Sequence, residues 1–443
     1  QANFTIIWAL KFTKGTVNMS FSDYKRMIYF FSCGIADKTP IVLENENTKA
    51  LRELAKENNV LPAVVYAFLK AKQSDENALK DENIKELQKE LFAAAMHETK
   101  RRYEIKRVLD AFKDANEEAC ILKGDSLSEL YCKNALRMSG DTDIYAGENI
   151  SEKKINKILE SAGLSVLKRP PESHHAMAVG KDAGLIEVHL SLHDEMFEEV
   201  WFFGKAKIKQ NYITKEAGGF SFKALSPTDE FLFVTMHFIK HFLSAGAGIK
   251  QLADVCLYVL KKGDEVDCLR AYELLRELKY DKFFDTALSI GADVLNIEKS
   301  KLRFINGYCE DDSLKDEILY DCFCGGAFGH NEKERNKFYE EYTKKRFETL
   351  DGKENYESYI KKTRTKAMLK RMILSSEELK KRYTYVKKSP LLIPAGHINH
   401  AAEIILNIVL GKRRVSQYRV GLPQSANDTV KKRMELIEKL EMI

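Results

Sequence analysis

Strand-like patterns in this chain are confined to one stretch between residues 119 and 190, and helical patterns occupy both sides of it. In residues 51–69 and 91–112, apolar side chains recur at steps of three and four, which is typical of amphipathic helices. After the helix-start signal Ser226-Pro227, the same criterion predicts helices at 228–243, 249–261, 269–277, 283–292, 332–347 and 428–443. We therefore predict an α+β (mixed α/β) protein whose small mixed sheet is flanked by mostly helical N- and C-terminal regions.

The chain is long enough for more than one domain, because 443 residues exceed the size at which a single hydrophobic core usually stops growing. We predict a helical N-terminal region at 19–115, an α/β core at 116–226 and a helical C-terminal region at 227–443. Residues 1–18 precede Met19-Ser20 and are interpreted as an extension outside the fold.

Composition excludes some classes of protein. The 71 basic and 66 acidic side chains leave a net charge of only +5, so overall charge does not indicate a nucleic-acid-binding protein. None of the eight cysteines forms a C-x-x-C pair, which argues against a zinc site and a disulfide framework and favours free thiols in the cytoplasm. The apolar run at 6–10 is too short to span a bilayer, and we predict no membrane segment.

A glycine follows the first predicted strand, at 119–122, where a helix through Leu130 and Tyr131 is expected to begin. Gly124 has no Cβ, so the backbone at this turn could approach a phosphate closely, and the N–H groups of a helix start attract anions. Taken alone, a glycine at such a turn is more often structural.

Two acidic residues occupy alternate positions of the next predicted strand, at 141–146. A period of two places the carboxylates of Asp141 and Asp143 on the same face. Charges of like sign so close together repel each other unless water or a divalent cation lies between them. A solvated acidic pair is the simpler interpretation of an isolated pair of this kind.

A third carboxylate lies on the predicted strand at 185–190, the last of a set that also includes strands at 164–167 and 175–179. Alternation places Glu187 and His189 on one face and Ile186, Val188 and Leu190 on the other. Beside Asp141 and Asp143, Glu187 would complete an oxygen-rich site for two Mg²⁺ ions. The alternative is an exposed strand face without a metal.

In this order, the elements resemble the polymerase-beta nucleotidyltransferase superfamily, and most closely a group of uncharacterised bacterial nucleotidyltransferases within it. The discriminating motifs lie between 121 and 193, and weaker similarity extends from about 50 to 400. The residues that carry the resemblance are Leu122-Lys123-Gly124, Leu130-Tyr131, Arg137, Gly140-Asp141-Thr142-Asp143-Ile144, Glu187-Val188-His189 and His193.

The resemblance implies a reaction in which a hydroxyl or an amine attacks the α-phosphate of a nucleoside triphosphate and pyrophosphate leaves. It implies that Asp141, Asp143 and Glu187 are catalytic and bind Mg²⁺ or Mn²⁺, with His189 as an accessory residue. The expected nucleotide-binding residues are Lys123, Gly124, Ser126 and Arg137. One departure is Asp125, since superfamily members commonly have Gly-Ser at this turn and an acidic side chain would repel a triphosphate unless it points away.

Other interpretations stay open at this stage. The rival function is a non-catalytic nucleotide-binding or regulatory protein that retains the fold. His237 and His241 lack the H-E-x-x-H pattern of zinc enzymes and are interpreted as packed or hydrogen-bonded structural residues. Eleven Lys and Arg residues between 361 and 388 are interpreted as a solvated helical face, so we expect the acceptor to be a small molecule or a protein rather than a nucleic acid.

Overall fold

The computed structural model forms two compact units, one of residues 1–335 with 435–442 and the other of residues 336–434 with 443. The structure describes residues 19–147, 149–167, 175–192, 202, 206, 208, 212–217, 219–244, 246–295, 297–301, 307–325, 332–350, 379, 383, 385, 386, 389–409 and 424–443. The extension at 1–18, His174, His193 and all eleven basic residues of the 361–388 run lie outside these described residues.

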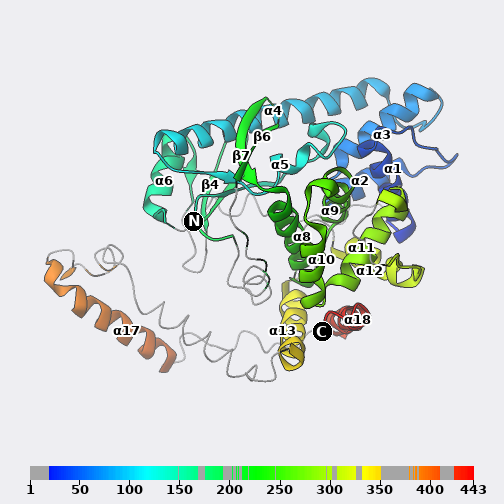
Figure 1. Cartoon of the computed structure of the whole chain (residues 1–443). Helices are drawn as coiled ribbons and strands as arrows, with labels where there is room; N and C mark the ends of the chain where they lie inside the picture. The colour runs from blue at the N-terminus through cyan, green and yellow to red at the C-terminus, as the bar shows by residue number, and fades with distance from the viewer. Residues whose placement is uncertain are drawn as a thin grey trace. The chain divides into compact units, whose positions relative to one another are not determined.

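The N-terminal region is helical, as predicted (Figure 1). Its helices are α1 (Phe21–Ile35), α2 (Thr48–Glu57), α3 (Leu61–Ser74) and α4 (Ile84–Asp114). Side chains cap three of the helix starts: Ser20 and Asp23 form a capping box at α1, and Asn47 and Asn83 accept backbone N–H groups at α2 and α4.

Seven strands form one mixed sheet in the order β3-β4-β5-β2-β1-β7-β6. Five of them occur where the sequence predicted strands: β1 (Cys120–Ile121), β2 (Asp141–Tyr145), β3 (Ser165–Val166), β4 (His175–Val179) and β5 (Leu185–His189). The central strand β2 pairs in parallel with β5 and antiparallel with β1.

Two predictions about this region are wrong. The strand at 185–190 is not the last, because β6 (Tyr212–Ala217) and β7 (Phe220–Leu225) form an antiparallel hairpin, and β7 extends the sheet parallel to β1. The missed signal is Gly218-Gly219 between two strand-length segments, a sequence typical of two-residue hairpins. The helix after Gly124 is also shorter than predicted, since α5 (Asp125–Ser128) ends before Leu130 and is followed by turns and the short helix η1 (Asn134–Leu136).

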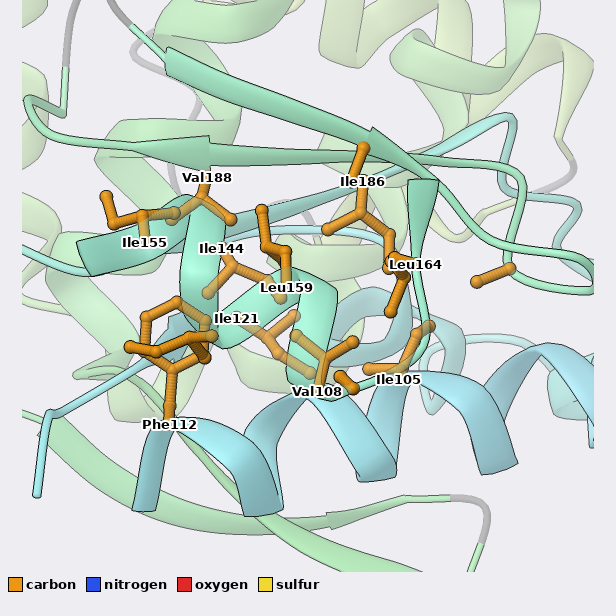
Figure 2. Close-up of a cluster of buried hydrophobic side chains, with 14 of the residues drawn as sticks. Ile105, Val108, Phe112, Ile121, Ile144, Ile155, Leu159, Leu164, Ile186 and Val188 are labelled. Atoms are coloured by element: carbon orange, nitrogen blue, oxygen red, sulfur yellow. The ribbon is translucent and has the colours of Figure 1, made fainter. Parts of the chain in front are cut away.

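One face of the sheet is covered by α4 and by α6 (Glu152–Ser161). Figure 2 shows this core, where Ile144 of β2 and Val188 of β5 pack with Val108 and Phe112 of α4. The predicted apolar face of β5 is therefore confirmed. Since neighbouring residues of a strand point to opposite faces, the carboxylates of β2 and β5 project from the face opposite to α4 and α6.

Helices predominate after the hairpin, and every helix predicted there is present. They are α8 (Pro227–Ser244), α9 (Ile249–Lys262), α10 (Cys268–Glu277), α11 (Asp281–Val294), α13 (Glu332–Leu350) and α18 (Gln424–Lys439). The short helices η2 (Gly263–Glu265), η3 (Lys299–Lys301) and η4 (Pro390–Leu392), with α12 (Asp312–Gly325) and α17 (Ile393–Val409), were not predicted.

All eight cysteines lie within the described residues, and none of them forms a disulfide. Across the helices that the structure describes, none combines the length and the apolar character needed to cross a membrane.

Candidate functional site

The parallel pairing of β2 with β5 brings two of the predicted acidic residues face to face. Asp143 is the register partner of Glu187, whereas Asp141 is paired with Leu185. The side chain of Asp143 is only 5% exposed, and that of Asp141, at the start of the strand, is 43% exposed. The sheet therefore joins Asp143 closely to Glu187 and leaves Asp141 at the solvent-facing edge of the same group.

His189 completes a cluster with these two carboxylates. Its Nε2 atom lies 2.9 Å from Oδ1 of Asp143 and 3.9 Å from Oε2 of Glu187. One possible ligand atom from each of these three residues lies within 4.8 Å of the other two. Two carboxylate oxygens and an imidazole nitrogen so close together are a donor set that suits a divalent cation.

Glu187 experiences an excess of negative charge. Burial first, and then the charges of Asp143 and Asp141, raise the pKa of Glu187 to about 7. A second imidazole is also close to it, with Nε2 of His175 at 3.8 Å from Oε1 of Glu187. The cluster therefore carries more negative charge than its surroundings fully balance, which is the condition under which a bound cation lowers the energy of the site.

Lys123 connects the glycine turn to the acidic pair. Its Nζ atom lies 3.1 Å from Oδ2 of Asp143 and 3.6 Å from Oδ2 of Asp141. Burial alone would lower the pKa of Lys123, but the two aspartates outweigh it and raise that pKa. Burial alone would likewise raise the pKa of Asp143, yet Lys123 and His189 hold it well below its usual range. The ion pair is thus charged on both sides.

His237 on α8 is a contact of the site that sequence reasoning did not identify. Its Nε2 atom lies 3.3 Å from Nζ of Lys123, and its ring contacts that of His241, with centroids 4.4 Å apart. Burial, and then the charge of Lys123, lower the pKa of His237 far below its ordinary value, so the neutral ring accepts a hydrogen bond from the ammonium. The sequence indicated a packed or hydrogen-bonded histidine, but its partner is 114 positions away and no local pattern connects the two.

The turn at Gly124 is held in place by Arg137. Gly124 has φ +81°, a conformation that disfavours other residues. Nη1 of Arg137 donates to the carbonyl oxygen of Gly124 (3.1 Å) and to Oγ of Ser139 (2.9 Å), while Nε and Nη2 donate to the carboxylate of Asp254 on α9. The buried guanidinium of Arg137 thus connects the turn at Gly124 to α9. Its contact with the candidate site is made through the carbonyl of Gly124.

Asp125 does not face the acidic cluster. Its fully buried carboxylate accepts hydrogen bonds from Arg101 (2.8 Å) and Arg102 (3.0 Å) of α4. Arg101 also donates to Oγ1 of Thr142, which projects from the opposite face of β2 to Asp143. Asp125, the residue that differs from the Gly-Ser pattern, therefore has its negative charge neutralised by two arginines of α4.

Ser126 is also buried. Its Oγ atom lies 3.5 Å from Nζ of Lys215, whose ammonium pairs with Glu230. The structure thus gathers Asp141, Asp143, Glu187, His189 and Lys123 at one place, whereas the side chains of Ser126 and Arg137 contact other partners.

A family model described as an uncharacterised nucleotidyltransferase matches residues 44–296. This match covers more than half of the 443 residues and contains the whole sheet, α8 and α9. Neither the curated proteins nor the solved structures contain a match to the chain.

Proposed function

Because this chain belongs to the uncharacterised nucleotidyltransferase family, we propose that it transfers a nucleoside monophosphate from a nucleoside triphosphate to an acceptor and releases pyrophosphate. The observation that carries this proposal is the register of β2 and β5, which sets Asp143 directly opposite Glu187 beside the glycine turn. The acceptor would be a hydroxyl or an amine of a small molecule or a protein.

The residues present fit a divalent metal such as Mg²⁺ or Mn²⁺. Asp143 and Glu187 would hold it, with Asp141 at the exposed side of the group, and His189 lies within the same 4.8 Å cluster as Asp143 and Glu187. When bound, the metal would neutralise charge on the phosphate oxygens during transfer.

The other residues of the site have roles that follow from their contacts. Lys123 lies on the carboxylate face and would donate to the triphosphate, as a point charge that suits phosphate. The backbone at Gly124 would approach the phosphates, and Arg137 would position this turn from behind. Ser126 is buried, so we assign it a supporting role at the start of α5.

The proposed transfer is a displacement at phosphorus, in which no atom is oxidised or reduced. The acceptor oxygen or nitrogen forms a bond to the α-phosphorus, and the bond from this phosphorus to the bridging oxygen of pyrophosphate breaks. The proton of the acceptor must move to a nearby base. Glu187 is the group on the carboxylate face that we propose for this task.

The test combines binding with turnover. The full chain would be incubated with each of the four α-³²P-labelled nucleoside triphosphates and Mg²⁺ or Mn²⁺, in the presence of a cell extract as a source of acceptors. Transfer of label to a small-molecule or protein fraction, together with pyrophosphate release, supports the proposal. Metal-dependent nucleotide binding without either product would indicate a nucleotide-binding or regulatory protein instead.

Replacing both aspartates of the D-x-D pair checks the site. The double variant with Asp141→Asn and Asp143→Asn should lose metal-dependent nucleotide binding and reduce transfer by at least about 100-fold, because the metal loses two charged ligands. A thermal shift assay with nucleotide and metal measures the binding, since a ligand of the native state raises Tm. Normal metal and nucleotide binding by this variant would place the site elsewhere.

A further inference from the structure

We infer that His189 is itself a metal ligand through Nε2, and that this nitrogen makes the centre formed with Asp143 and Glu187 prefer Mn²⁺ to Mg²⁺. The inference rests on the proposed function, because it concerns the identity of the metal at that same site. A site made only of carboxylates would have no nitrogen ligand and would not favour Mn²⁺ over Mg²⁺ in this way.

The geometry of the strands supports this assignment. Glu187 and His189 stand two positions apart on β5 and therefore project from the same face, and Asp143 is the register partner of Glu187 on β2. Their ligand atoms lie within 4.8 Å of one another. Two ligands of one cation, each with a bond of about 2.2 Å, would lie at most about 4.4 Å apart, which is close to the spacing of these atoms.

The orientation of the imidazole is the second argument. A single atom, Nε2 of His189, approaches both carboxylates, at 2.9 Å from Asp143 and 3.9 Å from Glu187. The side chain of His189 is only 17% exposed, so its ring is largely enclosed in this orientation. The nitrogen thus already lies beside an oxygen of each carboxylate, as three ligands of one cation would.

Ligand chemistry connects this geometry to the metal. Mg²⁺ prefers oxygen ligands and retains its water molecules strongly, whereas imidazole nitrogen binds first-row transition metals readily. Mn²⁺ accepts carboxylate and phosphate oxygens as well as imidazole, so it suits both this donor set and a triphosphate substrate. A nitrogen ligand should thus raise the affinity for Mn²⁺ more than that for Mg²⁺.

A different role for His189 is a hydrogen bond that only orients Asp143. Both roles predict weaker activity after substitution, so activity cannot distinguish them. Electron spin-echo envelope modulation of bound Mn²⁺ can, because a directly coordinated imidazole produces a strongly coupled ¹⁴N signal, whereas an imidazole that is only hydrogen-bonded to another ligand is coupled weakly at most.

The experiment compares the full-length wild-type chain with His189→Gln and with His175→Gln as a matched control. His175 offers a second imidazole near Glu187 but does not belong to the three-residue cluster. The ¹⁴N signal is expected in the wild type and in His175→Gln and should be absent in His189→Gln. Calorimetric titration of His189→Gln should show at least about 10-fold weaker Mn²⁺ binding and less than about 3-fold weaker Mg²⁺ binding.

The other possible outcomes would each contradict a specific part of the proposal. Bound Mn²⁺ without a ¹⁴N signal in the wild type would show that His189 is no ligand, while metal-dependent nucleotidyl transfer could still be correct. A signal that disappears in His175→Gln but persists in His189→Gln would assign the nitrogen to His175. Failure of the wild type to bind either cation, with or without nucleotide, would contradict the metal dependence of the proposed function as well. Retained Mg²⁺ binding by His189→Gln serves as the control for folding.

Discussion

At the scale of single residues, the site depends on how Lys123 and the carboxylates share charge. The ammonium of Lys123 lies within 3.6 Å of both Asp141 and Asp143 and donates a hydrogen bond to Nε2 of His237. In the chain without metal, this one side chain balances much of the negative charge on the carboxylate face. Its removal should therefore make the protein more dependent on a divalent cation.

We predict that Lys123→Met destabilises the metal-free protein by about 3 kcal/mol, because it removes the ammonium that pairs with buried Asp143. Added Mn²⁺ should then raise Tm more in the variant than in the wild type, since the cation replaces the lost positive charge. Thermal unfolding in EDTA and in Mn²⁺ measures both effects. Lys223→Met, which removes an exposed ion pair with Glu118, is the control and should change neither quantity. Equal stabilisation of Lys123→Met and wild type by Mn²⁺ would contradict the prediction.

At the scale of elements, α4 supports the site from the opposite side of the sheet. Its apolar face forms the core beneath β2 and β5, and Arg101 and Arg102 neutralise Asp125 next to the glycine turn. One turn further along, Glu104 accepts the backbone N–H groups of residues 181–183, in the loop that joins β4 to β5. A single helix thus contacts both the turn that carries Gly124 and the loop that precedes β5, the strand of Glu187.

We predict a pH-dependent contribution from Glu104. Burial alone would raise the pKa of Glu104, but three backbone N–H donors outweigh it and hold the pKa below its ordinary value. A lowered pKa in the folded state means that the stabilisation is present above the unfolded pKa of about 4.3 and is lost as the pH falls through the folded pKa. Glu104→Gln should therefore lower the free energy of unfolding by about 1–3 kcal/mol at pH 7.

The measurement is the difference in Tm between wild type and Glu104→Gln as a function of pH. This difference should be largest near pH 7 and should shrink as the pH drops below about 4.3. A difference that stays constant down to pH 3 would mean that the charge of Glu104 does not support the loop. Asp110→Asn, on the exposed side of the same helix, provides a control in which an ion pair with Lys106 contributes little.

At the scale of the whole molecule, the sheet and the helices α8 to α11 after it belong to one compact unit. Arg137 reaches Asp254 on α9, which also accepts a hydrogen bond from the hydroxyl of Tyr131 (2.9 Å). His237 on α8 reaches Lys123. Helix α8 therefore contacts Lys123 beside the glycine turn, and α9 supports the turn through Arg137, in agreement with a family match that extends to residue 296.

We predict that Asp254→Ala disturbs the site from a distance. Arg137 would remain buried without its carboxylate partner, which should cost about 3–5 kcal/mol of stability. Because Arg137 also holds the carbonyl of Gly124, nucleotide affinity should fall together with stability. Chemical denaturation and nucleotide titration at a temperature where the variant is folded test the two effects separately. Unchanged nucleotide affinity in a destabilised variant would limit the role of this pair to folding.

The sequence by itself determined what depends on local periodicity. The period of two predicted that Asp141 and Asp143 lie on one face of their strand and that Glu187 and His189 lie on one face of theirs. The helical periodicity predicted the flanking helices, and both patterns follow from backbone geometry within a few residues. The hairpin β6-β7 was also readable from Gly218-Gly219, but its signal was missed.

Only the tertiary structure decided which strands are neighbours and in which register, and hence that Asp143 faces Glu187. It also decided that Lys123 meets His237 and that Arg137 meets Asp254, pairs separated by 114 and 117 positions. The physical reason is that such contacts arise from the packing of whole elements around a shared core. No pattern within a short segment records the element against which that segment will pack.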